Sequence, residues 1–220
     1  MLAGTQAFAQ ISVGAGYSNV TQRIQATGLN KDITMHGVYA GMDYTVALTE
    51  NIGLTPGIYY EFSNGSADKL LNIGAASTLL KGRLEEHYID IPVKFSFSIP
   101  YQGSRFFAYA GPTACIGVGS KIKGDVKVLG FELKGDVLDM YDKNIFESVD
   151  FMLGGGIGVD LMNTFRITAG YNWGMFNRIK QEGQSSQNAG EGTGFNIGEL
   201  IRNNATIKRQ QFTVGVAFLF

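Results

Sequence analysis

The sequence has few of the residues on which disulfides, zinc sites and membrane-spanning helices depend. It has one cysteine, Cys115, and two histidines, His36 and His87, so it can form neither an intramolecular disulfide nor a recognised Cys/His zinc spacing. No run of about 18 uninterrupted apolar residues occurs, which argues against a transmembrane helix. With 18 basic and 19 acidic residues the net charge is −1, so there is no basic field for nucleic acid. We therefore predict no metal, no cofactor and no nucleic-acid partner.

Glycine and aromatic residues are abundant instead, with 30 glycines and 12% aromatics at a mean hydropathy of +0.02. This composition is typical of neither a disordered chain nor a helical membrane protein. The stretch LAGTQAFA, residues 2–9, looks like the tail of a secretory signal peptide, with Ala7-Phe8-Ala9 as its cleavage site. We expect residues 1–9 to be residual signal peptide and 10–220 to form one domain; the alternative is an ordinary N-terminal segment.

Eight segments alternate between apolar and other residues with the period of two that predicts β-strands. In the last, Phe212, Val214 and Val216 share one parity with Phe218 and Phe220. The segments are 11–18, 36–48, 52–62, 86–99, 105–118, 148–161, 164–174 and 207–220. No sustained helical periodicity is present, so the chain is predicted to be all-β.

The connections between these segments alternate strictly between long and short. The long polar connections are 19–35, 63–85, 119–147 and 175–206, and the tight turns are 49–51, 100–104 and 162–163. This pattern is typical of an up-and-down outer-membrane barrel with short periplasmic turns and long extracellular loops. We predict an eight-stranded antiparallel transmembrane β-barrel, integral to the outer membrane, with both termini at the periplasmic end. The last strand then pairs with the first, which leaves no sticky edge.

One face of the predicted strands suits lipid, and the opposite face suits a polar lumen. The apolar parity carries no charged residue and no Ser, Thr, Asn or Gln, whereas the opposite parity carries charges and many glycines. An eight-stranded barrel is only just wide enough to be filled by side chains, so small and polar residues fit inside and large apolar ones face lipid. The charged residues predicted to face the lumen are Asp43, Glu61, Asp90, Lys94, Asp150, Asp160 and Arg166.

Outward aromatic residues are predicted to form two belts at the membrane interfaces. The belt near the short turns consists of Phe97, Phe106, Phe165, Phe218 and Phe220, and the belt near the long loops of Tyr17, Tyr60, Phe62, Tyr171 and Trp173. Tyr44 is placed at mid-strand, outside both belts.

Two interpretations of the inward charges remain open from the residues alone. The charges either pair with one another as a structural network, because an unpaired buried charge is costly, or line a narrow pore. Arg105 and Arg209 have the inward parity as well, and we expect them to add partners near the short-turn end.

Two features that resemble catalytic or nucleotide-binding motifs lack the necessary context. The glycines of Gly154–Gly158 lie inside a strand and open no helix, so they are predicted to leave lumen space rather than to bind phosphate. His87 neighbours Glu86, but adjacent strand residues point to opposite faces, so that pair is not a catalytic dyad. We expect His36 and His87 to be solvated interfacial residues and predict no catalytic residue.

Two of the long connections have features of their own. Residues 119–135 are expected to extend the neighbouring strands as a hairpin about Gly130. The stretch 181–196 is rich in Gly, Gln, Ser and Asn and is expected to be flexible.

The strand sequences also resemble a known family. YIDIPVKF at 88–95, AYAGP at 108–112, VDF at 149–151 and GGGIGV at 154–159 are similar to recurring strands of the PorT-like outer membrane β-barrel family of Bacteroidota. The resemblance implies an outer-membrane barrel inserted by the barrel assembly machinery, with the strand ending in Phe218 and Phe220 as the assembly signal. The family has varied functions, so it implies no catalytic residues.

The sequence thus predicts a non-enzymatic integral outer-membrane protein with a role in envelope structure or in loop-mediated binding. Its expected partners are outer-membrane lipid and lipopolysaccharide, the assembly machinery during insertion, and an extracellular or periplasmic protein. A narrow pore or transport accessory is the alternative. A barrel enzyme, either an acyltransferase or a protease, is a further alternative.

Overall fold

The computed structural model describes residues 9–26, 29–66, 69–73, 76–128, 131–133, 136–139, 148–178 and 205–220. All regular structure in these ranges is β-strand, and no helix among them is long and apolar enough to cross a membrane. The strands are β1 (Ala9–Ala26), β2 (Leu29–Ala47), β3 (Ile52–Ser66), β4 (Lys69–Ile73), β5 (Ala76–Tyr101), β6 (Ser104–Val128), β7 (Phe131–Leu133), β8 (Asp136–Asp139), β9 (Val149–Leu161), β10 (Phe165–Gly174) and β11 (Ala205–Leu219). The predicted signal peptide, residues 1–9, lies outside the described part except for Ala9.

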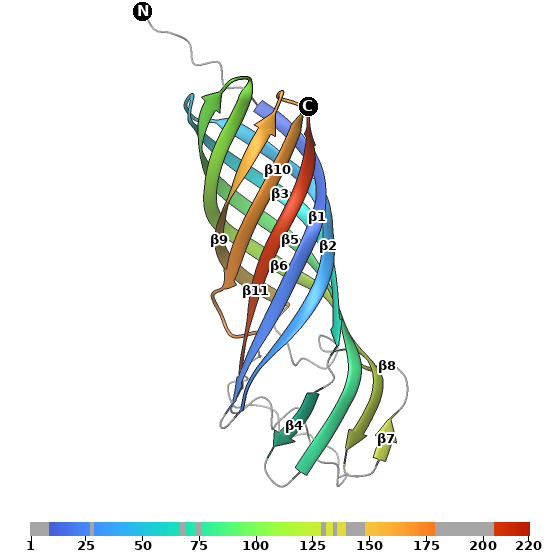
Figure 1. The fold of residues 1–220 in the computed structure, drawn as a ribbon. Coiled ribbons are helices and arrows are strands. Elements are labelled where there is room, and N and C mark those ends of the chain that lie inside the picture. Colours follow the sequence, from blue (N-terminus) through green and yellow to red (C-terminus); the bar gives the residue numbers. More distant parts are fainter. Residues whose placement is uncertain are drawn as a thin grey trace, which may run out of the picture.

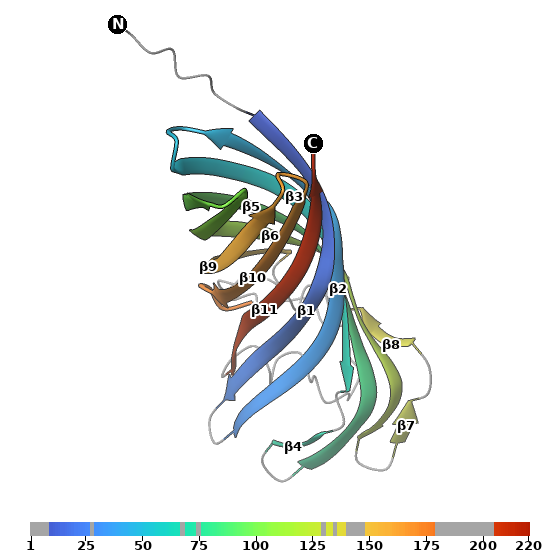
Figure 2. The same ribbon diagram turned by 45° about the horizontal axis from the view of Figure 1, so that its top comes forward.

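Eight of these strands close into an antiparallel barrel, which confirms the predicted fold class. Each strand pairs with its neighbour in the order β1, β2, β3, β5, β6, β9, β10 and β11, and β11 returns to β1, with Val13 opposite Phe218. Figures 1 and 2 show the wall curving round until β11 lies beside β1, with the start of β1 and the end of β11 at the same end. Closure leaves neither strand with an unpaired edge, so the sheet can lie in a bilayer.

Tight turns connect the strands at the end where the chain leaves β11. Gln102 and Gly103 join β5 to β6 with φ of 47° and 77°, the two positive values that a type I′ hairpin turn requires. Met162 and Asn163, with φ of 52° and 53°, begin the short link from β9 to β10. Both turns were predicted from the sequence.

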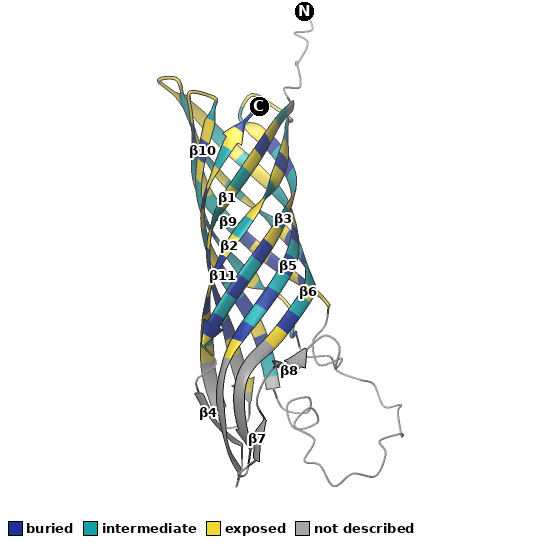
Figure 3. Cartoon of the chain, turned by 90° about the vertical axis from the view of Figure 1, so that its right-hand side faces the viewer, coloured by how far each residue is buried: buried dark blue, intermediate teal, exposed yellow. Residues whose placement is uncertain are grey.

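The outer surface of the barrel is apolar along most of its length. Figure 3 shows buried and exposed residues alternating along each strand, as expected when one face meets the lumen and the other the lipid. The exposed side chains include Ile11, Val13, Val38, Met42, Ile58, Phe95, Phe97, Phe106, Ile157, Ile167, Val214 and Val216. This surface is the predicted lipid face.

Three of the four predicted long loops were wrong in extent, because the structure places strand in much of each. β1 and β2 fill most of 19–35 and pair up to Ala26 and Leu29; β3, β4 and β5 occupy most of 63–85; and β6, β7 and β8 enter 119–147. The predicted hairpin about residue 130 is present, since Val128 pairs with Phe131. Residues 129–130 themselves, and the predicted flexible stretch 181–196, lie outside the described residues.

Beyond the aromatic belt at the long-loop end, β1, β2 and β5 keep the same residues facing inward and outward, but the inward residues become apolar and the outward ones polar. Val20, Met35 and Leu84 face inward and form a buried apolar cluster with Ile33 against it. The outward positions there are polar and exposed, among them Arg23, Gln25, Asp32 and Thr34. An apolar interior with a polar surface is the arrangement of a water-exposed domain. We call this part, with the paired ends of β5 and β6 and strands β4, β7 and β8, the extension; it projects from the barrel in Figure 1.

Tyr44 lies near the short-turn end rather than at mid-strand. It is exposed and opposite Ile11 at the start of β1, only three residues before β2 ends. It therefore belongs with the belt at that end, which corrects its predicted position.

Candidate functional site: the charged lumen

The small residues on the inner wall make room for large aromatic side chains. A Cβ added at Gly16 would lie 2.5 Å from the Tyr39 ring, and one added at Gly156 would lie 2.5 Å from the hydroxyl of Tyr109. Tyr39 and Tyr59 meet edge to face with centroids 5.7 Å apart. The glycines therefore set the lumen volume that the polar side chains share.

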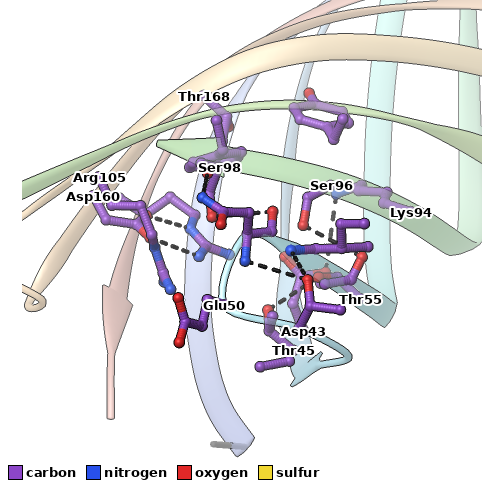
Figure 4. A pocket seen from close by; sticks show the side chains of 18 residues that line it. Asp43, Thr45, Glu50, Thr55, Lys94, Ser96, Ser98, Arg105, Asp160 and Thr168 are labelled. Atoms are coloured by element: carbon purple, nitrogen blue, oxygen red, sulfur yellow. Dashed lines mark hydrogen bonds and ion pairs between the residues drawn. The ribbon is translucent and has the colours of Figure 1, made fainter. Parts of the chain in front are cut away.

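The layer nearest the short turns is centred on Asp160, which is fully buried. Arg105 donates to Asp160 from Nε at 3.0 Å and from Nη2 at 2.7 Å, and Arg166 donates from Nε at 2.7 Å and from Nη2 at 3.0 Å. The Arg166 guanidinium also stacks on the Phe107 ring at 4.8 Å. One carboxylate thus holds two guanidiniums, each of them through two hydrogen bonds. Figure 4 shows Arg105 and Asp160 side by side.

The middle layer contains the only lysine among the predicted lumen charges. The Lys94 ammonium lies 3.9 Å from Asp43 and 5.3 Å from the ring centroids of both Tyr59 and Tyr109. Asp43 accepts a 2.5 Å hydrogen bond from the Tyr59 hydroxyl. The Lys94 side chain keeps 28% exposure because cavities lie beside it.

Two cavities of about 60 and about 90 Å³ lie along this part of the lumen. The first, seen in Figure 4, is bounded by the short turn around Glu50 and by Arg105 and Asp160. The second lies further in, beside Tyr39 and Asp90, and shares Lys94 and Arg166 with the first. Since a water needs roughly 10–15 Å³ of such space, both cavities can hold several waters.

The next layer is dry and centred on Glu61 and Arg209, both 0% exposed. Arg209 Nη2 donates to Glu61 Oε2, Gln211 donates to the same oxygen at 2.6 Å, and Ser18 donates to Oε1 at 2.8 Å. Arg209 also stacks on the Tyr88 ring at 4.1 Å. It lies in the half of the lumen away from the short turns, so its predicted position near the short-turn end was wrong.

A second dry layer pairs Arg178 with Glu86 at 3.0 Å, with both side chains at most 1% exposed. Ser120 donates to Glu86 at 3.4 Å, and Arg178 donates to the Tyr88 hydroxyl. Arg178 was not among the predicted site residues. It follows β10 in a segment without regular structure, so no strand parity could assign it to the lumen.

Asp90 and Asp150 are buried but less tightly paired. Asp90 Oδ1 lies 3.8 Å from Arg209 Nη1, and Asp150 Oδ1 accepts the Phe151 amide at 2.8 Å. All seven predicted charges thus lie on the inner wall, spread over several layers rather than gathered in one site. Among the described residues, no group of three or more His, Cys, Asp or Glu could hold a metal ion.

The two histidines lie on the outer face near the long-loop end. His36 Nδ1 is 2.5 Å from the Tyr17 hydroxyl, and His87 Nδ1 is 2.6 Å from the Tyr60 hydroxyl. His87 also contacts the Phe62 ring at 4.9 Å. Both histidines therefore join the aromatic belt there.

The proposed assembly residues lie on the outer face at the opposite end. Phe218 contacts Phe165 and Phe220, with ring centroids 5.5 and 4.9 Å apart. The three rings form a continuous aromatic surface at the short-turn belt.

Known barrel structures resemble the chain in fold but differ in sequence. Neisserial surface protein A is 9% identical, with 94% of this chain and 96% of that one covered and a TM-score of 0.42. The attachment invasion locus protein of Yersinia pestis is 12% identical, covering 96% and 99% at a TM-score of 0.42. OprG of Pseudomonas aeruginosa is 9% identical, covering 97% and 96% at 0.42. None of the curated proteins compared with the chain matches it.

A family match is consistent with the closed barrel and its apolar exterior. Residues 6–180 match the family described as outer membrane protein beta-barrel domain, which covers most of the chain. The chain therefore belongs to this outer-membrane β-barrel family and is an integral outer-membrane protein.

Proposed function

We propose that this protein is a non-enzymatic, non-conducting outer-membrane barrel whose extension is a binding surface for a protein partner outside the cell. The observation that carries the proposal is that the outward residues of β1 and β2 are apolar in the barrel wall and polar beyond it. β1 and β2 form part of the membrane wall and continue beyond it, where Arg23, Gln25, Asp32 and Thr34 are exposed and Val20 and Met35 are buried. A surface that is built on paired strands needs little ordering when it binds a partner, which favours affinity.

The buried ion-pair layers support a non-conducting barrel. Two buried ion pairs lie in the lumen, Glu61 with Arg209 and Glu86 with Arg178. The side chains of the first pair are 0% exposed, and those of the second are at most 1% exposed. An ion passing this section would have to separate charges that are already paired in a dry environment, which is costly. Among the described residues, the two cavities that can hold water lie on the short-turn side of these layers, so we favour the structural network over the pore.

The orientation follows from the general construction of bacterial barrels. Short turns face the periplasm in such proteins and the longer connections face the outside. The start of β1 and the end of β11 would then lie on the periplasmic side, and Phe218 and Phe220 would be available to the assembly machinery. Arg23 and Lys208 lie opposite each other on the outer face of the extension, where cations suit the phosphates of lipopolysaccharide.

Cysteine labelling on intact cells tests this proposal. Gln25 in the extension and Glu50 in a short turn are both exposed and are replaced singly by cysteine, while Cys115 is buried and stays unreacted. A membrane-impermeant maleimide with a photo-crosslinking group is expected to label Gln25→Cys in intact cells and to capture a protein neighbour on illumination. Glu50→Cys is expected to react only after the outer membrane is opened.

Two results would contradict the proposal. Labelling of Glu50→Cys but not Gln25→Cys in intact cells would invert the orientation and move the binding surface to the periplasm. Stable conductance steps from the purified wild-type protein in planar bilayers would show that the two ion-pair layers do not close the lumen.

A further inference from the structure

Two cations lie directly opposite each other on the outer face where β1 and β11 close the barrel. Arg23 on β1 is in register with Lys208 on β11, and both side chains are exposed. Like charges at directly opposite positions of a sheet repel each other, so this arrangement destabilises the strand pair unless a counter-charge is present. β1 and β11 contain no Asp or Glu, so neither strand supplies that counter-charge.

The neighbouring strand β2 supplies a counter-charge to one of the two cations. Asp32 lies opposite Arg23 and accepts from its Nε at 3.3 Å. Lys208 is on the far side of Arg23 and makes no ion pair or hydrogen bond with any residue that the structure describes. On another part of the outer face, by contrast, Lys121 of β6 lies opposite Glu85 of β5. The pair of Arg23 and Lys208 therefore keeps a positive charge that the described side chains do not balance.

Two uncharged side chains complete a group of four with these cations. Thr21 on β1 lies opposite Gln210 on β11, one outward position nearer the barrel wall. Gln210 accepts the Tyr171 hydroxyl through Oε1 at 2.9 Å, so its amide nitrogen remains to donate outward. Opposite residues are about 5 Å apart and alternate residues along a strand about 7 Å apart, so the four side chains surround an area that suits one phosphate. We call Thr21, Arg23, Lys208 and Gln210 the donor group.

The donor group lies at the headgroup level of the bilayer. Trp173, in the aromatic belt at the long-loop end, is opposite Gln210. Because Trp and Tyr in such a belt lie at the level of the lipid headgroups, Lys208, two residues beyond Gln210, is at the level of their phosphates. On the membrane side, Phe212 and Val214 are 43% and 40% exposed and continue the lipid face. A lipid with its phosphate at the donor group would therefore lay an acyl chain over these two residues.

We propose that the donor group binds a phosphate of lipid A, the lipid part of lipopolysaccharide. The phosphate lies between Arg23 and Lys208, where its negative charge removes their repulsion, and it accepts hydrogen bonds from Thr21 and Gln210. The choice of lipid A over a phospholipid rests on the proposed function, because that orientation puts this end of the barrel in the outer leaflet. Since β1 continues from the donor group into the extension, the bound lipid steadies the base of the proposed binding surface.

Native mass spectrometry of the folded protein in detergent tests the site without depending on orientation or on a protein partner. Added monophosphoryl lipid A is expected to remain bound as one molecule per barrel, and the same lipid without its phosphate to bind about tenfold less. Lys208→Met is expected to lower lipid A binding about tenfold, whereas Lys208→Arg, which keeps the cation, retains most of it. Lys121→Met, at an exposed lysine that faces Glu85, is the matched control and is expected to change nothing.

The combined variant Arg23→Met with Lys208→Met is expected to bind lipid A and its dephosphorylated form equally weakly. The heat-dependent shift of the gel band checks that each variant is folded. Equal binding of the two lipids by the wild-type protein, or unchanged lipid A binding in the folded combined variant, would overturn the site.

Two competitors test the source of the phosphate. Displacement of lipid A by inorganic phosphate would show that the donor group takes a free anion and would overturn a lipid ligand. Equally strong binding of phosphatidylglycerol would overturn the choice of lipid A. Labelling of Gln25→Cys in cells tests the proposed function separately, so either proposal can fail without the other.

Discussion

Replacing Arg209 with methionine is expected to destabilise the folded barrel by about 3–5 kcal/mol, because it leaves a buried carboxylate without its cation. Glu61 is fully buried and would keep the hydrogen bonds from Ser18 and Gln211 but lose its cation. Methionine retains much of the length of the side chain, so the lost charge rather than lost volume determines the effect. Urea unfolding in lipid vesicles, followed by the gel-band shift and by fluorescence, measures the change.

A second substitution and a surface control make this prediction specific. Glu61→Gln with Arg209→Met is expected to be more stable than Arg209→Met alone, since neither side of the pair is then charged. Arg23→Met removes a surface ion pair whose partners are 46% and 48% exposed, and is expected to cost less than about 1 kcal/mol. Equal costs for Arg23→Met and Arg209→Met would contradict the dry layer.

Asp160→Asn is expected to destabilise the barrel by about 3 kcal/mol or more, because it leaves two arginines facing each other without a counter-charge. The substitution preserves size, so no cavity forms. Arg166→Met is expected to have a smaller effect than Asp160→Asn, and Arg105→Met the smallest, since Arg105 is partly exposed at the lumen mouth. The same unfolding measurement ranks the three variants.

Combining two of these substitutions checks the physical reason. Asp160→Asn with Arg166→Met is expected to recover part of the stability lost in Asp160→Asn, because one of the two unbalanced cations is removed. If instead Asp160→Asn costs no more than Arg105→Met, the carboxylate does not hold both guanidiniums together.

The period of two in the sequence predicts the eight barrel strands, but it makes most of them too short at the long-loop end. The alternation identifies Phe212, Val214 and Val216 as outward, and the structure agrees. The same search stops at 18 in β1 because Val20 is inward and apolar, which reverses the pattern on which the prediction depends. In β6, an irregularity opposite the His87–Tyr88 step shifts the phase, which ends the alternation near residue 118.

Parity identifies which charges face the lumen, but not which charges meet. Arg209 has inward parity, yet its depth and its contact with Glu61, three strands away on β3, depend on how strands are staggered around the barrel. Arg178 carries no periodic signal because it follows the last residue of β10. Because proline has no amide hydrogen, the sequence alone predicts missing backbone hydrogen bonds at Pro56, Pro92 and Pro112. That these positions are close to one another on neighbouring strands is known only from the strand register.

The central claim is that the apolar parity faces lipid, and Trp173 tests it most directly because it is the only tryptophan in the chain. Trp173 lies on the outer face with 52% exposure, beside Tyr171 at a centroid distance of 4.7 Å in the long-loop belt. In folded protein in vesicles, lipids brominated near the headgroup end of the acyl chain are expected to quench its fluorescence strongly. Lipids brominated at the chain end and aqueous iodide are expected to quench it weakly. Strong quenching by iodide without quenching by any brominated lipid would contradict a lipid-facing surface.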